Sequence, residues 1–239
     1  MLKFFAALLF VCSGLVQAQD TLHTDLPLNY LAQASSDTPN TPLVIFIHGY
    51  GSNAADLFSL KDRLPSGYNY LSVQAPVELQ TDSYKWFTRK PGVTEYDGVT
   101  DELKSSTERL TAFIGQATDK YQTQPEKVFL VGFSQGAMMS YEVALRQPAL
   151  VGGIAALSGR LLPVVKSGLQ PSDALKHLNV FIGHGTEDRQ VSYASGPDAE
   201  ATLKALGLKP EFHGYQGLGH SLSEAEVSDL AQWLEESAR

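Results

Sequence analysis

The sequence has almost no cysteine: of its 239 residues only Cys12 carries a thiol. A single cysteine forms no internal disulfide, and it cannot supply the cysteine cluster of a structural zinc site. Cys12 also lies in a segment that we expect to be removed, so the mature protein should have no thiol nucleophile. Its fold must then be stabilised by an apolar core.

Basic clusters and cofactor motifs are also missing. Lys and Arg number 18 against 26 Asp and Glu, which gives a formal charge of −8, and the basic residues do not gather in one stretch. Nucleic acid is therefore not an expected partner, because phosphate contacts need a basic surface. Neither the His-Glu-x-x-His pattern of zinc hydrolases nor a glycine-rich phosphate loop occurs. We expect no metal and no cofactor.

Residues 1–18 have the pattern of a secretory signal peptide. Lys3 supplies a positive start, residues 4–11 form an apolar run too short to span a bilayer, and Ala18 ends the segment with a small residue. Cleavage there would leave 221 residues without cysteine. We expect a periplasmic or secreted protein that is not inserted in a membrane after cleavage, as a monomer or homodimer.

Other interpretations of this segment are a membrane anchor, a first core helix, or lipidation of Cys12. Val11 argues against lipidation, because a small residue normally precedes a lipidated cysteine. After the segment, no linker divides residues 19–239, so we expect one domain.

Strand and helix patterns alternate from residue 43 to the end of the chain. Apolar runs predict strands at residues 43–47, 70–74, 128–131, 153–157, 180–182 and 211–215, and helical spacing predicts helices at 101–121, 137–146, 200–206 and 224–235. Such alternation is typical of an α/β fold with a mostly parallel central sheet and helices on both faces. Sheets of this kind carry their chemistry at the carboxyl ends of the strands.

A candidate nucleophile lies in the sequence Gly132-Phe133-Ser134-Gln135-Gly136. Ser134 follows a buried strand and precedes a helix, where a nucleophile elbow holds its serine at the top of a sheet. The two glycines suit a turn without room for side chains, and the helix N-terminus favours developing negative charge. We predict that Ser134 is the nucleophile; the alternative is an idle serine in a glycine-rich turn.

The serine needs a base, and the chain has six histidines. His220 lies in a glycine-flanked loop after the last predicted strand, from which its imidazole can reach Ser134. His213, inside that strand, is the main competitor. His48 and His184 each end a strand, and we expect both to be structural.

A carboxylate must hold the base in the correct tautomer. Asp188 and Glu187 both follow the strand at 180–182, and Asp188 lies deeper in the loop. The chain order Ser134, Asp188, His220 is the order of nucleophile, acid and base that this type of sheet requires. Two backbone N–H groups should hold the oxyanion: that of Gln135, and one from the loop at 48–53, where Tyr50 is the expected donor.

Several motifs together resemble the phospholipase/carboxylesterase family, the α/β-hydrolases that include acyl-protein thioesterases. They are residues 48–58, residues 132–137, the pair Ser158-Gly159, His184-Gly185 with Asp188 and Val191, and Gly219-His220. The resemblance covers about residues 42–236. It implies an α/β-hydrolase fold and a serine esterase with the triad and oxyanion donors named above.

The family's acyl pocket corresponds to Trp86 and Phe87, with Leu161, Leu162 and Pro163 at its rim. These side chains, with Tyr84, could instead belong to the core. Family members that are thioesterases usually carry Leu where Tyr50 stands, which favours general ester hydrolysis. The 221 mature residues leave no room for a large cap domain, so we expect an open site and a short- to medium-chain acyl ester. A lysophospholipid, a thioester, and an aromatic, feruloyl or polyester-fragment ester are the alternatives. An inactive binding domain would lack a triad residue, and none is missing.

Overall fold

The computed structural model describes residues 21–35, 38–89 and 101–239. Residues 1–18, the predicted signal peptide, lie outside the described part. No helix among the described residues is long and apolar enough to cross a membrane.

One seven-stranded sheet forms the centre of the molecule, in the order β1-β3-β2-β6-β7-β8-β9. All neighbouring strands are parallel except β1, which pairs antiparallel with β3 at one edge. The strands are β1 (Tyr30–Gln33), β2 (Leu43–Ile47), β3 (Asn69–Val73), β6 (Val128–Phe133), β7 (Gly153–Leu157), β8 (Asn179–Gly185) and β9 (Glu211–Tyr215).

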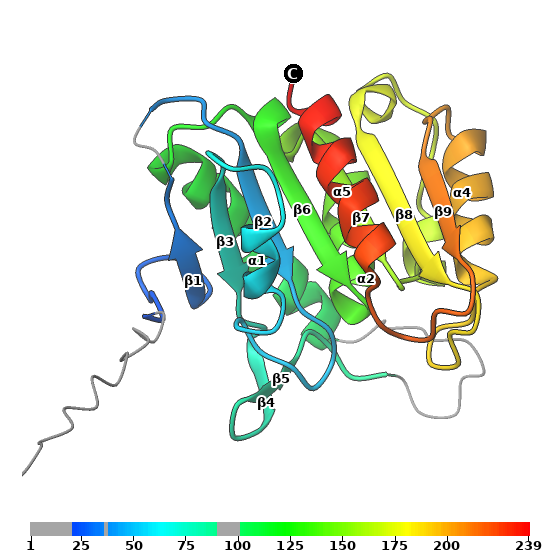
Figure 1. Ribbon diagram of the computed structural model, residues 1–239, viewed down its shortest axis with the longest axis horizontal. Coiled ribbons are helices and arrows are strands. Elements are labelled where there is room, and N and C mark those ends of the chain that lie inside the picture. The colour runs from blue at the N-terminus through cyan, green and yellow to red at the C-terminus, as the bar shows by residue number, and fades with distance from the viewer. Residues whose placement is uncertain (1–20, 36–37, 90–100) are drawn as a thin grey trace, which may run out of the picture.

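Helices cover both faces of this sheet (Figure 1). One face packs against α1 (Asp101–Lys120), α2 (Gln135–Arg146), α3 (Pro163–Lys166) and α4 (Ser195–Ala205). The other face packs against the 3-10 helix η1 (Phe58–Asp62) and α5 (Glu224–Ser237). Three further single-turn helices connect elements: η2 (Pro125–Lys127), η3 (Pro148–Leu150) and η4 (Ala174–His177). The predicted α/β-hydrolase architecture is confirmed.

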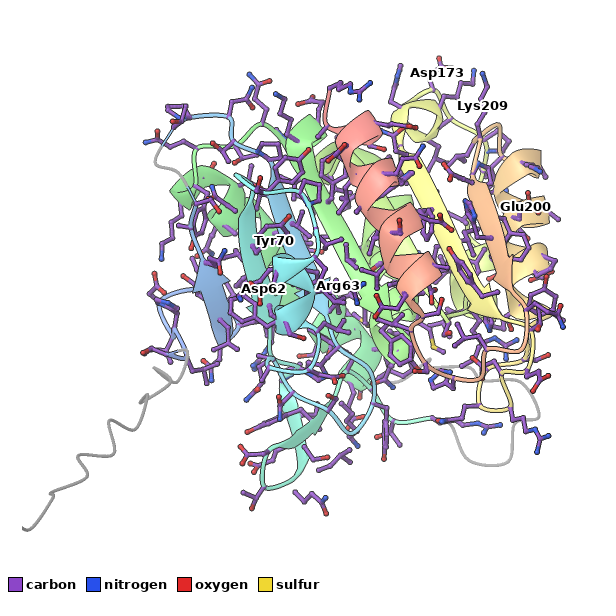
Figure 2. All side chains as sticks on the ribbon, viewed as in Figure 1. Asp62, Arg63, Tyr70, Asp173, Glu200 and Lys209 are labelled. Carbon is purple, nitrogen blue, oxygen red and sulfur yellow. The ribbon has the colours of Figure 1, made fainter. Side chains whose placement is uncertain are left out.

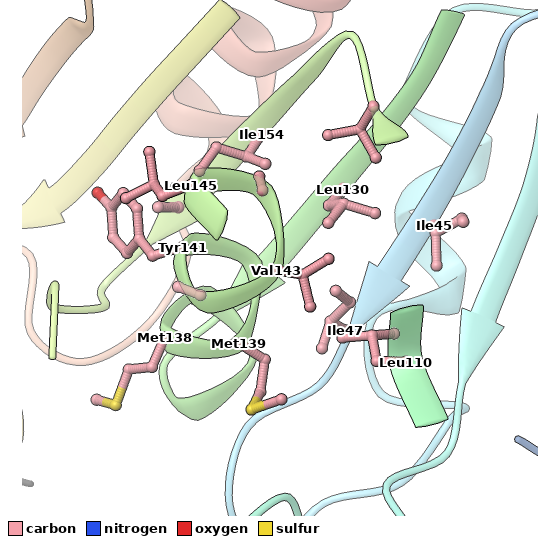
Figure 3. Packing of buried hydrophobic residues seen from close by; sticks show 14 of the residues in the cluster. Ile45, Ile47, Leu110, Leu130, Met138, Met139, Tyr141, Val143, Leu145 and Ile154 are labelled. Atoms are coloured by element: carbon pink, nitrogen blue, oxygen red, sulfur yellow. The ribbon is translucent and has the colours of Figure 1, made fainter. Parts of the chain in front are cut away.

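The core lies mainly between the sheet and α2. The α2 helix is buried along almost its whole length. Figure 3 shows its Met139 and Val143 directed toward Leu130, Ile45 and Ile47 of the sheet. Charged side chains such as Glu200 and Lys209 point away from the sheet at the outer side of the molecule (Figure 2). This packed core holds in place the strands whose carboxyl ends are expected to carry the chemistry.

Small elements decorate the carboxyl edge of the sheet. The hairpin of β4 (Val77–Gln80) and β5 (Ser83–Lys85) extends from this edge (Figure 1). Between β7 and β8 the chain forms the short helices α3 and η4. Among the described residues no insertion here is large enough to form a cap domain.

Candidate active site

Three side chains from different strand ends form one hydrogen-bonded chain. Ser134 follows β6, Asp188 lies in the loop after β8, and His220 lies in the loop after β9. The Ser134 hydroxyl lies 2.9 Å from Nε2 of His220, and Nδ1 of His220 lies 2.7 Å from Oδ2 of Asp188. The structure thus brings the three predicted residues together in the arrangement of nucleophile, base and acid.

Ser134 has a backbone conformation that ordinary residues rarely adopt, with φ 54° and ψ −116°. The surrounding turn is too tight for side chains. A Cβ on Gly132 would lie 2.4 Å from the carbonyl oxygen of Gly136, and a Cβ on Gly136 would lie 1.9 Å from that of Ile47. The glycines therefore permit the strained turn that holds the serine out at the end of β6.

Asp188 is buried, and both of its carboxylate oxygens accept hydrogen bonds. Its Oδ1 accepts the backbone N–H groups of Gln190 and Val191, at 2.8 and 2.9 Å, while Oδ2 faces His220. Burial alone would raise the pKa of Asp188, but these hydrogen bonds outweigh it and hold the pKa below its ordinary value. The carboxylate is therefore charged at neutral pH. Glu187, the other candidate acid, is exposed.

The remaining histidines have other partners. His213 lies 2.6 Å from Glu211 and stacks on Phe181, on the face covered by α5, so the competitor for the base is engaged elsewhere. His184 donates from Nε2 to the carbonyl oxygen of Val191 at 2.9 Å. His48 donates from Nδ1 to the carbonyl oxygen of Gly49. Burial lowers the pKa of both His48 and His184, so each is neutral and structural, as predicted.

The loop after β2 lies directly against the serine. A Cβ on Gly49 would be 3.3 Å from Cβ of Ser134, which places the next residue, Tyr50, beside the nucleophile. The hairpin holds this loop, since Gly51 N–H donates to Tyr84 O and Tyr84 N–H donates to Ser52 O, both at 2.8 Å. Among the described residues the Tyr50 N–H donates to no protein acceptor. The Tyr50 N–H is therefore available for the predicted role of oxyanion donor.

A buried network joins this loop to Gln135, the other predicted donor. The Gln135 side chain accepts from Trp86 N–H and donates to Phe87 O, both at 2.8 Å. The Trp86 indole N–H donates to the carbonyl oxygen of His48 at 2.9 Å. Nε2 of His48 in turn accepts the N–H of Ala75. These bonds fix both donor segments relative to each other before any substrate arrives.

The four residues proposed for substrate contact are buried. Trp86, Phe87 and Leu162 have no exposed surface, and Leu161 is 3% exposed. All four pack in the apolar core, which agrees with the core alternative left open by the sequence. Leu161 also lines a cavity of about 330 Å³ together with Arg160 and Lys166.

Two neighbours of the triad were given no role of their own from the sequence. The Phe133 ring lies 4.9 Å from that of His220, centroid to centroid, and forms a wall behind the imidazole. Ser158 is buried at the end of β7 with φ 48°, next to a Gly159 whose Cβ would collide with Ala137. In the sequence both belong to motifs named above, Phe133 to the elbow and Ser158 to the pair Ser158-Gly159, but no local pattern indicates what their side chains contact. Within the described residues no group of three or more His, Cys, Asp or Glu could hold a metal ion.

Comparisons with known proteins bear on this site. Residues 28–238 match the model of the Phospholipase/Carboxylesterase family. Acyl-protein thioesterase 1 of Debaryomyces hansenii is 29% identical over 219 residues, which cover 85% of this chain and 94% of that protein. Carboxylesterase SOBER1 of Arabidopsis thaliana is 39% identical over 114 residues, which span only 47% of this chain and 49% of that protein. The Bacillus cereus carboxylesterase structure superposes with a TM-score of 0.75 at 23% identity, over 88% of this chain and 94% of that chain.

Proposed function

The chain belongs to the phospholipase/carboxylesterase family and is a carboxylic ester hydrolase, and we propose that it cleaves short- to medium-chain acyl esters through Ser134, Asp188 and His220. The observation that carries the proposal is the continuous hydrogen-bonded chain from Ser134 through His220 to a buried, charged Asp188. That chain gives the serine a base and gives the base a fixed tautomer.

In the proposed reaction Ser134 Oγ attacks the ester carbonyl carbon while His220 Nε2 takes the hydroxyl proton. The N–H groups of Tyr50 and Gln135 hold the oxyanion, and Asp188 stabilises the imidazolium. The C–O bond to the alcohol breaks, and His220 gives its proton to the departing oxygen. Water then attacks the acyl-enzyme with His220 again as base, which releases the acid and restores Ser134.

The test is hydrolysis of p-nitrophenyl esters from acetate to palmitate by the purified protein beside Ser134→Ala. We expect a maximum at short or medium chains, and turnover lower on the order of a million-fold in the variant. Equal rates for the two proteins across the series would contradict the proposal. A maximum at palmitate would instead favour a lipid or lysophospholipid substrate.

Two substrate classes remain to be compared with simple esters. Relatives bear the name acyl-protein thioesterase, so an S-acyl substrate is the first alternative. An aromatic or feruloyl ester is the second. Matched O- and S-butyryl substrates and a feruloyl ester, assayed for kcat/KM with the same protein, separate the three classes.

We further propose that the chain is exported and loses residues 1–18. The positive start, apolar run and terminal small residue of that segment support this. Intact mass of the protein recovered from a bacterial periplasm or medium tests it: cleavage before Gln19 is the expected result, and a full-length cytosolic product would contradict export.

A further inference from the structure

A groove of about 280 Å³ opens directly beside the imidazole of His220. Its walls are apolar: Leu57 is buried, and Leu60, Phe133 and Leu222 are partly buried in the cluster beneath α5 and η1. Its rim is polar and exposed, formed by Asp56, Ser59 and Ser221. The groove thus has the apolar lining and polar rim of a small ligand site.

The two walls come from distant parts of the chain and are tied together. One wall is η1 with the residues before it, and the other is the segment from His220 to Leu222 that leads into α5. Arg63, at the end of η1, donates to both carboxylate oxygens of Glu224 at the start of α5, with Nη1 to Oε1 at 2.7 Å. Figure 2 shows Arg63 lying at the η1 side of α5. Both walls also share one buried apolar cluster, and this packing, with the exposed ion pair beside it, sets their spacing.

The position of the groove identifies the part of an ester that it faces. In the proposed reaction the carbonyl oxygen lies at the Tyr50 and Gln135 N–H groups, while the alcohol oxygen must lie near Nε2 of His220 to receive its proton. The carbon chain of the alcohol then extends along the ring of His220. We propose that this groove binds the alcohol portion of the substrate and selects alcohols that are neutral and apolar. The assignment rests on the proposed esterase function.

Charge around the groove argues for a neutral alcohol. Asp56 places a carboxylate at the rim, and none of the described residues lining the groove is Lys or Arg. The two basic residues beside the groove are each paired with an acid: Lys61 with Asp62 at 2.9 Å, and Arg63 with Glu224. An alcohol that carries a phosphate or a carboxylate would meet a negative charge without a compensating cation, so such esters should be poor substrates.

Size sets the second limit. Pockets for drug-sized molecules hold about 300–1,000 Å³, and this groove lies just below that range. It accommodates one compact group, such as a benzyl ring, against Leu60 and Leu222. We therefore expect benzyl butyrate to be a better substrate than methyl butyrate, by about tenfold in kcat/KM, which is typical for an apolar group that fills a pocket.

The experiment measures kcat/KM for three butyrate esters: methyl, benzyl and 4-carboxybenzyl. All three form the same butyryl-enzyme, so kcat/KM isolates the step in which the alcohol is still bound. Leu60→Trp and Leu222→Trp fill the groove. Leu79→Trp, at a leucine of β4 that is 38% exposed, is the matched control.

We expect each groove variant to lower the benzyl-to-methyl ratio of kcat/KM about tenfold, and Leu79→Trp to leave it unchanged. The 4-carboxybenzyl ester should be the poorer of the two benzyl esters. A ratio that does not move in either groove variant would overturn the assignment while leaving the esterase intact. Equal rates for the benzyl and 4-carboxybenzyl esters would overturn neutral selection. No hydrolysis of any ester beyond that of Ser134→Ala would overturn the proposed function, and the groove assignment with it.

Discussion

The two sides of Ser134 differ in the groups that form them and in how those groups are held. On the proposed oxyanion side are the backbone N–H groups of Tyr50 and Gln135, and buried hydrogen bonds through Trp86 and His48 hold the segments that carry them. On the imidazole side, His220 is about a tenth exposed and is backed by the Phe133 ring and an apolar groove.

The difference follows from what each side must do. Backbone donors are useful only if they are fixed in place, so a rigid buried network suits them. An imidazole must exchange protons with the alcohol and with water, so it needs an opening as well as a carboxylate. Damage on the oxyanion side should therefore slow all esters alike. Damage on the imidazole side should change the proton chemistry or the choice of alcohol.

Among substitutions that keep the nucleophile, the largest expected effect is on the imidazole side, from Asp188→Asn. Oδ1 of Asp188 already accepts two backbone N–H groups, so the Asn carbonyl oxygen would take that place and the amide NH₂ would face Nδ1 of His220. The imidazole would then carry its proton on Nε2, where it cannot accept the proton of Ser134. We expect kcat for p-nitrophenyl butyrate to fall about 10⁴-fold.

The control for this prediction is Glu187→Gln, an exposed neighbour in the same loop, which should leave kcat unchanged. A loss of less than tenfold in Asp188→Asn would show that the carboxylate does not set the tautomer, and the imidazole side would need another explanation.

The same two sides differ in how far the sequence predicts them. The triad could be predicted because its residues follow apolar strands in a required order, with glycines marking the elbow. The network through Trp86 could not, because it joins positions 38 and 49 residues apart. The groove joins η1 to a segment about 160 residues later. Contacts of such separation depend on the packing of the whole sheet and leave no local pattern.

The fold shows a similar division between centre and edge. The central strands β2, β6 and β7 are fully or almost fully buried, and their continuous apolar runs predict them well. The edge strand β1 has only four residues, of which two are buried, and the hairpin strand β4 is mostly exposed. Neither has an apolar run, so periodicity did not predict them.

A second prediction concerns an acid beneath the imidazole side. Glu226 of α5 is buried against Gly183 of β8, and neither of its carboxylate oxygens has a hydrogen-bond partner among the described residues. Burial raises the pKa of Glu226 to about 7. Its ordinary value is 4.5. Between these values the folded protein holds a proton that the unfolded chain has lost, so stability falls as the pH rises toward 7.

Glu226→Gln removes this titration. We expect its stability relative to the parent protein to increase by about 2 kcal/mol between pH 5.5 and pH 8. Urea unfolding at the two pH values measures it, with Glu235→Gln, an exposed carboxylate on the same helix, as control. A relative stability that stays constant with pH would mean that Glu226 is ionised in the folded protein.

The smallest expected effect tests the oxyanion side and uses the two tryptophans of the chain. Trp86→Phe removes the indole N–H that bonds to His48 O together with part of a buried ring system, which loosens the loop carrying Tyr50. Trp233→Phe removes the indole of an α5 residue that packs in the core on the opposite face of the sheet. Both should cost stability, but only Trp86→Phe should lower kcat, by about tenfold, because a small displacement of an oxyanion donor is costly. The loss should be equal for methyl and benzyl butyrate, since both pass through the same oxyanion. A change in the ratio between them would show that the two sides of Ser134 are coupled through the elbow.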